Sequence, residues 1–235
     1  MRITTQAWET YIRRLAQLNE KAAQLMAEYL AAHGTADTEA LTDYAAALVQ
    51  KYGEGSAELA CQMYDAMAAL QNARVSPAEP AAPASRREVA RIVQATRKSP
   101  PQMQQGVSRL VKQAGADTTL KNAQRDGAEF AWVPHGDSCA FCLTLASRGW
   151  QKASQAAIKG GHAEHIHANC DCEYAVRFDG RTSVAGYDPE AYLAQYNAAG
   201  GDINRMRRVD YAANKERINA QKRAAYEARK IRGDP

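Results

Sequence analysis

The sequence predicts a mainly α-helical fold that is interrupted by one small β-element and ends in a basic helix. Apolar side chains recur every three or four residues over most of the chain, which is the spacing of helices with one buried face. Apolar and polar residues alternate around 170–178, which indicates a strand. Lysine and arginine crowd the segment 203–232, where the helical spacing continues.

The composition is that of a globular protein. The 235 residues suffice for one large domain or two small ones, and 46% hydrophobic with 24% charged residues is an ordinary globular balance. No apolar run approaches the roughly 20 residues of a membrane span, and none follows the first residues. We therefore expect no signal peptide, no membrane partner and synthesis in a reducing cytoplasm. The net charge of +4 is uneven, because 1–75 is slightly acidic and 203–232 is strongly basic.

Residues 1–75 predict an N-terminal helical arm. A first helix ends at Gly34, which can adopt the left-handed conformation of a helix cap. Thr38 opens a second helix, which we expect to end near Gly53, with Ser56 capping a third helix. These helices would form an antiparallel hairpin or bundle. We interpret their apolar stripes as core packing, with an oligomerisation seam on the first helix as the alternative.

The segment 76–84 is rich in proline and alanine and predicts a stiff, extended linker. We place the boundary between the arm and the rest of the chain there. Helical patterns resume at Ser85 and break at Pro100. A short further helix is expected from Asp117, which caps it, to Gly127.

An α+β module is predicted at 85–200, because strand patterns appear after its helices. Residues 129–133 form a strand, and a cysteine pair follows in a turn before a short helix that ends at Gly149. The second strand, at 170–178, carries cysteines on its apolar face. A helix begins at Asp188, which is a capping residue followed by proline at the first helical position.

Four of the five cysteines lie in two close pairs, with a histidine three residues ahead of the second pair. Thiolates and imidazole are the ligands of a tetrahedral structural zinc ion, and clustered cysteines in a reducing compartment favour metal over disulfides. The spacing does not decide which four of five candidates bind, and His162 and His165 are spare donors nearby. Reduced thiols packed in a small core are the alternative. The predicted zinc ligands are Cys139, Cys142, His167, Cys170 and Cys172.

A structural zinc suits this part of the chain. The segment is short, rich in loops and poor in large apolar side chains, so it buries little surface of its own. A zinc ion supplies on the order of 10 kcal/mol of folding free energy. We therefore expect the small β-element to be zinc-stabilised. Cys61 stands apart within a helical pattern, and we expect it to be a buried core thiol.

Two enzyme classes use similar residues, and the order of the motifs disfavours both. His162-Ala-Glu164 matches the H-x-E of zinc deaminases, but those enzymes carry C-x-x-C after it, whereas this chain carries it before. A zinc-bearing nuclease of the His-metal finger type needs a helix where this sequence predicts a strand. No phosphate-binding loop, dinucleotide fingerprint or serine elbow is present. We expect no catalysis, with a metal-dependent DNA nuclease as the alternative function.

The last segment, 201–235, predicts a basic C-terminal helix. Few acidic residues interrupt its basic ones, which suits phosphate contact or an acidic protein surface. Aromatic residues are sparse there, so any DNA binding would be non-specific and salt-sensitive. A solvated helix without a partner is the alternative. The candidate binding residues are Arg205, Arg207, Arg208, Lys215, Arg217, Lys222 and Arg223.

Three features of the chain form one combination. They are the motif Asp137-Ser-Cys139-Ala-Phe-Cys142, a short helix to Gly149, and then the motif His167-Ala-Asn-Cys170-Asp-Cys172. It resembles the phage Mu F-like minor head (head morphogenesis) proteins. That family shows an aspartate ahead of C-x-x-C, a short helix, and H-x-x-C-x-C. The resemblance covers roughly 85–200 and does not extend to the N-terminal arm.

The resemblance implies a structural protein of a phage or prophage head, made in the host cytoplasm and located in the virion. It implies a minor capsid protein at the portal or capsid interior, which assists head assembly or DNA packaging. The expected partners are the portal protein, the major capsid protein or both, in an oligomeric assembly, with DNA as a non-specific further contact. It also implies a metal site at the same four cysteines and one histidine, supported by Asp137.

Overall fold

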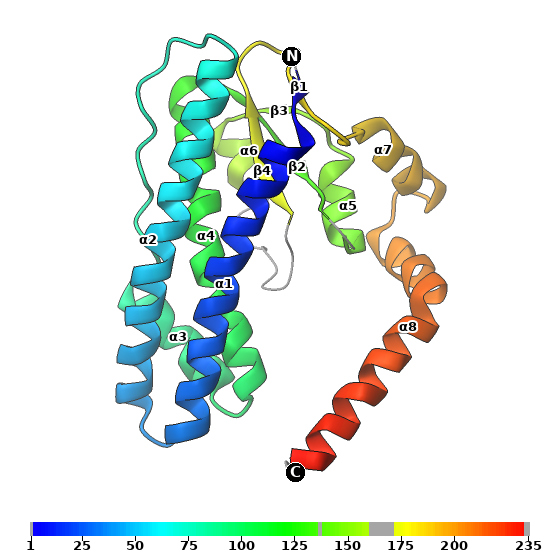
Figure 1. The fold of residues 1–235 in the computed structure, drawn as a ribbon. Coiled ribbons are helices and arrows are strands. Elements are labelled where there is room, and N and C mark those ends of the chain that lie inside the picture. Colours follow the sequence, from blue (N-terminus) through cyan, green and yellow to red (C-terminus); the bar gives the residue numbers. More distant parts are fainter. Residues whose placement is uncertain (1, 136–137, 160–171, 233–235) are drawn as a thin grey trace. The chain divides into compact units, whose positions relative to one another are not determined.

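A computed structural model describes residues 2–135, 138–159 and 172–232 (Figure 1). These residues are mainly helical with a small antiparallel sheet, as the sequence predicts. The chain divides into two compact units. The first holds Met1–Gly136 and Gly149–Tyr187, and the second holds Asp137–Arg148 and Asp188–Pro235.

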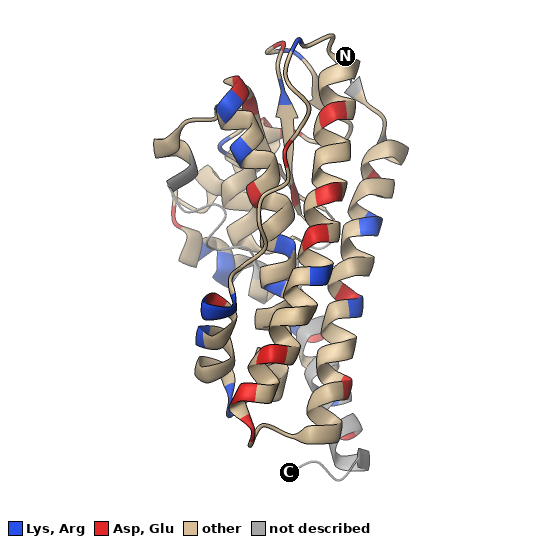
Figure 2. Cartoon of the chain, turned by 90° about the vertical axis from the view of Figure 1, so that its left-hand side faces the viewer, with Lys and Arg blue, Asp and Glu red and all other residues tan. Residues whose placement is uncertain are grey.

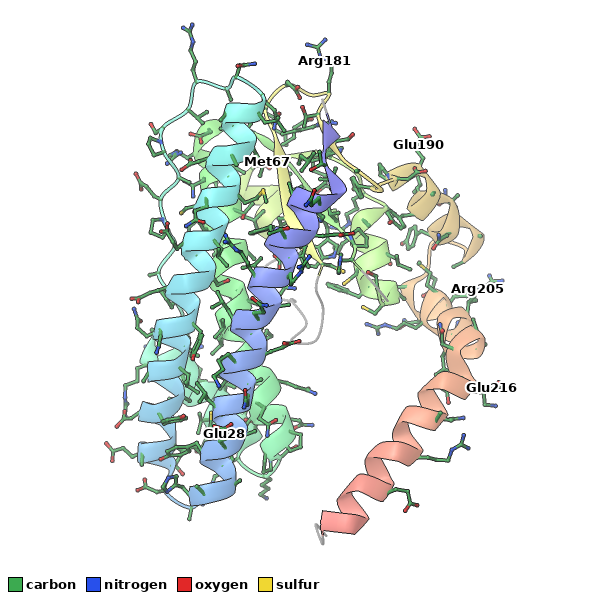
Figure 3. All side chains as sticks on the ribbon, in the orientation of Figure 1. Glu28, Met67, Arg181, Glu190, Arg205 and Glu216 are labelled. Carbon is green, nitrogen blue, oxygen red and sulfur yellow. The ribbon has the colours of Figure 1, made fainter. Side chains whose placement is uncertain are left out.

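The N-terminal hairpin is confirmed, and its two helices are α1 (Thr5–His33) and α2 (Thr38–Leu70). Gly34 ends α1 with a φ of 67°, and its N–H donates to the carbonyl of Leu30. The Asp37 carboxylate accepts two backbone N–H bonds at the start of α2. Each helix has a buried side and an exposed side. Figure 3 labels one example of each: Met67 of α2 is buried, and Glu28 of α1 is exposed to solvent.

The predicted break near Gly53 and the predicted third helix from Ser56 are wrong, because α2 runs through both positions without interruption. Small residues are needed there for close contact. A Cβ atom on Gly53 would lie 3.0 Å from the Cβ of Pro83. Ser56 is buried, and a Cβ atom on Gly115 would lie 2.6 Å from its Oγ. The glycines allow other segments to approach α2, and they do not form a turn.

Two further helices pack against this hairpin, α3 (Arg86–Thr96) and α4 (Pro100–Asp126). A capping box between Ser85 and Glu88 starts α3. The separate short helix expected from Asp117 is wrong, because α4 is continuous through that residue. The helix does end at Gly127 in the left-handed conformation, as predicted.

The Pro/Ala segment 76–84 lies along α4 as an extended strap. The backbone N–H of Ala81 donates to the Thr118 hydroxyl at 2.9 Å. Asn122 accepts from the N–H of Glu79 at 3.0 Å and donates to its carbonyl at 2.8 Å. Side chains of α4 therefore satisfy backbone groups that a solvated linker would leave to water. The boundary predicted at 76–84 falls inside the first compact unit.

A three-stranded antiparallel sheet completes the core of the first unit. Its strands, in spatial order, are β3 (Gln151–Lys152), β2 (Glu129–Val133) and β4 (Glu173–Arg177). Trp132 lies opposite Tyr174, and their rings meet edge to face with centroids 4.7 Å apart. The second strand was predicted at 170–178, and within the described residues it begins at Glu173.

Small elements that the sequence did not predict flank this sheet. They are the parallel pair β1 (Arg2–Ile3) and β5 (Ser183–Val184), and the short helix α6 (Gln155–Lys159). The turn before β5 is organised by Asp179, whose carboxylate accepts N–H bonds from Arg181 and Thr182. These bonds lower the pKa of Asp179 to about 2.

The second unit contains α5 (Ala140–Ala146), α7 (Pro189–Ala198) and α8 (Ile203–Arg232). The Asp188 cap and the basic C-terminal helix are confirmed. The described part of this unit buries few large side chains. One buried apolar cluster consists of Ala140, Ala199 and Met206, α5 also buries Cys142, Leu145 and Ala146, and no residue of α7 is buried.

Substitution of Gly115 by alanine tests the contact between α2 and α4. We expect Gly115→Ala to lower the free energy of unfolding by about 1–3 kcal/mol, because the new methyl group collides with Ser56. Urea denaturation measures the change. Gly55→Ala is the matched control, since its methyl group would meet only the end of Leu18 at 3.3 Å. The double variant Ser56→Ala/Gly115→Ala should recover part of the loss, and a Gly115→Ala protein as stable as the parent contradicts this account.

Candidate functional site

Two of the predicted zinc ligands lie at the start of α5. Cys139 is the residue that precedes the helix, and it is partly exposed. Cys142 lies three residues later within the helix and is 1% exposed. The sequence placed this pair in a turn, whereas the structure places it on the first turn of a helix. Residues spaced by three on a helix share one side, so the C-x-x-C spacing suits binding by both sulfur atoms.

A third predicted ligand, Cys172, directly precedes β4 and is fully buried. Its Sγ accepts a hydrogen bond from the backbone N–H of His135, at 3.4 Å. Backbone N–H donors of this kind commonly support metal-bound thiolates. The three described thiols thus fit a soft divalent ion such as zinc by their chemistry. Cys139 and Cys142 belong to the second unit, and Cys172 belongs to the first.

The other candidate ligands, His167 and Cys170, lie outside the described residues, as do His162, His165 and Asp137. Within 2–135, 138–159 and 172–232, no three His, Cys, Asp or Glu residues form a group that could hold a metal ion. The five-residue zinc site therefore remains a prediction from the sequence spacing.

A buried ion pair lies next to Cys172 in the chain. The Nζ atom of Lys112, on α4, lies 3.0 Å from a carboxylate oxygen of Glu173, and the two side chains are only 2% and 4% exposed. Lys112 also lies over the Trp132 ring, 6.0 Å from its centroid. The pair joins α4 to the strand that begins immediately after Cys172.

Tyr11 of α1 belongs to the same buried polar cluster. Burial raises the pKa of Tyr11 well above its ordinary value, and the negative charge of Glu173 raises it further. A hydrogen bond with Thr119 of α4 acts in the opposite direction. Tyr11 is therefore a neutral phenol at physiological pH. The cluster links α1, α4 and β4 through polar contacts in an otherwise apolar interior.

The basic residues of α8 lie mostly in solvent. Arg205, Arg207, Arg208, Lys215 and Arg223 are exposed, while the side chains of Arg217 and Lys222 lie outside the described part of the chain. Figure 3 labels Arg205 in the first turn of α8. These residues are accessible to a partner, but their exposure does not distinguish DNA from protein.

Comparison with known proteins identifies the family. A family model described as VG15 protein matches residues 2–199, which include both cysteine pairs and all of the helical hairpin. The chain belongs to the VG15 protein family. Neither a search of curated proteins nor a search of solved structures returned a match.

Membership of the VG15 family makes this a protein of a viral family, which agrees with the phage origin that the sequence predicts. The match extends from the first helices to α7, whereas the Mu F-like resemblance covered only 85–200. The N-terminal hairpin is therefore part of the family's common region. Among the described residues, no helix is both long and apolar enough to cross a membrane.

Sequence reasoning missed two features of the site. His135 was not considered, although its backbone contacts Cys172. The ion pair of Lys112 with Glu173 was also missed, because the alternation in the second strand places Glu173 on the polar face. A lysine within the apolar stretch Leu110-Val-Lys-Gln-Ala114 was the available signal, but local spacing cannot identify its partner, which lies in a distant strand.

Removal of one partner of the buried pair should be strongly destabilising. We expect Lys112→Met to lower the free energy of unfolding by about 3–5 kcal/mol, because Glu173 would remain charged and buried. The double variant Lys112→Met/Glu173→Met should lose less than either single variant. Urea denaturation of the four proteins gives the coupling energy.

An exposed ion pair provides the control. Arg86 of α3 lies 2.7 Å from Asp43 of α2, and both side chains are more than half exposed. Figure 2 shows this surface, where acidic residues of α2 lie near basic residues of α3. Arg86→Met should cost less than about 1 kcal/mol. Similar losses in Lys112→Met and Arg86→Met would contradict the role assigned to the buried pair.

Cys61 is a buried core thiol, as predicted, and is 6% exposed on α2. Burial, followed by the charges of Glu58 and Asp65, raises the pKa of Cys61 to about 11. Because the pKa is raised, the reactive thiolate is only about a thousandth of the total at pH 8.

Native Cys61 should react with iodoacetamide about a hundredfold more slowly at pH 8 than in urea. Labelling is followed at this residue by mass spectrometry, and its rate should rise as the pH approaches 11. The denatured chain is the control because unfolding removes the burial. Equal labelling rates in the native and denatured protein would show that Cys61 is neither buried nor protonated.

Proposed function

We propose that this VG15-family protein is a minor capsid or head-morphogenesis protein of a phage or prophage. It acts as a structural component at the portal or in the capsid interior, without catalysis, and is located in the virion. The main support is one combination: a viral family model matches residues 2–199, and the C-x-x-C and H-x-x-C-x-C motifs of head proteins lie inside that match.

The proposed cofactor is a structural zinc ion held by four of Cys139, Cys142, His167, Cys170 and Cys172. When bound, zinc would supply a cross-link among these side chains and folding free energy. The start of α5 presents two of the thiols, and the N–H of His135 supports the sulfur of Cys172. The small core of the second unit gives a physical reason for such a cross-link, because few large apolar side chains are buried in its described part.

The proposed partners are the portal protein, the major capsid protein or both, in an oligomeric assembly, with DNA as a non-specific contact of α8. The described residues contain packed helices with buried side chains and one exposed basic helix, and both features suit a structural role. The competing function is a metal-dependent DNA nuclease, which would use His167 for catalysis.

Zinc content and thiol protection test the proposal together. Full-length protein purified without chelator should contain about one zinc per chain by elemental mass spectrometry. The partly exposed Cys139 should resist iodoacetamide until a chelator is added, and then react. Cys61 should stay protected in both conditions, because burial alone protects it. Cys139→Ser should lose the metal, while the matched variant Cys61→Ser should retain it.

Two outcomes would contradict the proposal. Rapid labelling of Cys139 in the untreated protein, together with the absence of zinc, would indicate that the cysteines are packed reduced thiols without a metal. Cleavage of plasmid DNA in magnesium or manganese that is lost in a folded His167→Ala variant would identify the protein as a nuclease.

A further inference from the structure

The second unit contains an apolar groove of about 320 Å³. Its walls come from all three helices of the unit. They include Ala140 and Leu143 of α5, Ala198 of α7, and Met206 and Val209 of α8. Gln195 supplies a polar side chain to the lining. The groove thus lies entirely within one compact unit and is made almost wholly of apolar surface.

Several large apolar side chains of the second unit are exposed, and one of them lines the groove. Val209, which lines it, is 62% exposed, and Leu193 and Tyr211 in the same unit are 43% and 44% exposed. In the described part of the first unit, Leu70 is the single large apolar side chain with comparable exposure. An apolar groove with an exposed apolar side chain such as Val209 in its lining is typical of an interaction site.

Basic groups lie beside the groove. The Arg205 guanidinium extends over the end of α7, since a Cβ atom on Gly200 would lie 3.3 Å from its Nη1 atom. Arg205 also precedes Val209 by one helical turn, so the two residues share one face of α8. The nearby acid Asp202 is engaged as the cap of α8, where it accepts N–H bonds from Asn204 and Arg205.

The wider charge of α8 has the same sign. The helix carries ten lysine and arginine residues against three aspartate and glutamate residues. Arg207 and Arg208, which lie between the groove-lining residues Met206 and Val209 in sequence, are exposed. A partner that enters the groove therefore meets positive charge at its rim and along the helix that follows.

We propose that this groove binds an acidic amphipathic helix of another protein. Apolar side chains of that helix would occupy the space next to Met206 and Val209, and its carboxylates would pair with Arg205 and the arginines that follow. Peptide helices commonly bind grooves in this way, through apolar residues spaced by three and four. Nucleic acid would use the same positive charge, but phosphate contacts make no use of an apolar groove. The apolar lining therefore favours protein.

The inference rests on the proposed function only in placing the partner among head proteins. Groove binding is measured on the protein as purified, with its metal left in place, and requires no virion. A failure of the groove test therefore leaves the zinc and virion tests unaffected, and the reverse also holds.

The test uses the full-length protein and a labelled synthetic helix of about 18 residues, with leucines at helical spacing and glutamates on both flanks. Fluorescence anisotropy measures its affinity. Val209→Asp should weaken binding at least tenfold, because it puts negative charge into the apolar groove. Arg205→Glu should also weaken it. Both residues are exposed, so neither change should disturb folding, and circular dichroism verifies this.

Tyr211→Asp is the matched control. Tyr211 lies on the same helix, about 200° around the axis from Val209, is similarly exposed, and does not line the groove. The affinity of the Tyr211→Asp variant for the ordered peptide should stay within about twofold of that of the parent protein. A peptide of the same composition in scrambled order should bind at least tenfold more weakly. A duplex DNA probe forms a second arm of the experiment.

Three results would overturn the proposal. Equal binding of the ordered and scrambled peptides would show that charge alone is recognised. An unchanged affinity in Val209→Asp, or no binding of the ordered peptide, would show that the groove is not used. Tight, salt-sensitive binding of DNA that displaces the ordered peptide and ignores Val209→Asp would identify α8 as a nucleic-acid surface.

Discussion

The buried ion pair between Lys112 and Glu173 is the contact on which the first unit depends. The sheet is made of three short strands, and the ion pair joins one of them to α4. The ion pair fixes β4 to α4 at one register, because a shift of one residue would turn Glu173 away from Lys112. Burial of two charges is costly, so the pair contributes specificity more than net stability.

This register also determines what lies next to β4. Cys172 immediately precedes Glu173, and its sulfur accepts a hydrogen bond from the N–H of His135, two residues after the end of β2. The same register places Trp132 opposite Tyr174, which packs the aromatic side of the sheet. The position of one predicted zinc ligand thus depends on the packing of α4 against the sheet. In the second unit, by contrast, the packing is thin, and the proposed zinc and the proposed partner helix would both add to it.

Helix ends were the most predictable features of the fold. Gly34, Gly127 and Asp188 act where the sequence indicated, because caps depend on local backbone geometry and on the next few residues. The breaks expected near Gly53 and at Asp117 were wrong for the opposite reason. Small residues such as Gly115 are needed where α2 and α4 pack closely together, and the neighbours that require them are distant in sequence. The partner of Lys112 was likewise not predictable from local spacing.

For the candidate site, the sequence supplied the residue types and the structure supplied the surroundings of three of them. The C-x-x-C pair lies on one helical turn and Cys172 is buried against a backbone donor, both of which suit the predicted ligands. His167 and Cys170 lie outside the described residues, so the choice among five ligands still depends on spacing alone. The exposed groove of the second unit had no signal in the sequence, because residues from three separated helices form it.

We propose that this chain is a structural part of a phage particle. Quantitative mass spectrometry of purified particles that encode the chain tests it most directly. The account predicts that the chain is present in mature particles, at a small and constant ratio to the major capsid protein. Its presence in infected cells together with its absence from both proheads and mature particles would contradict the account.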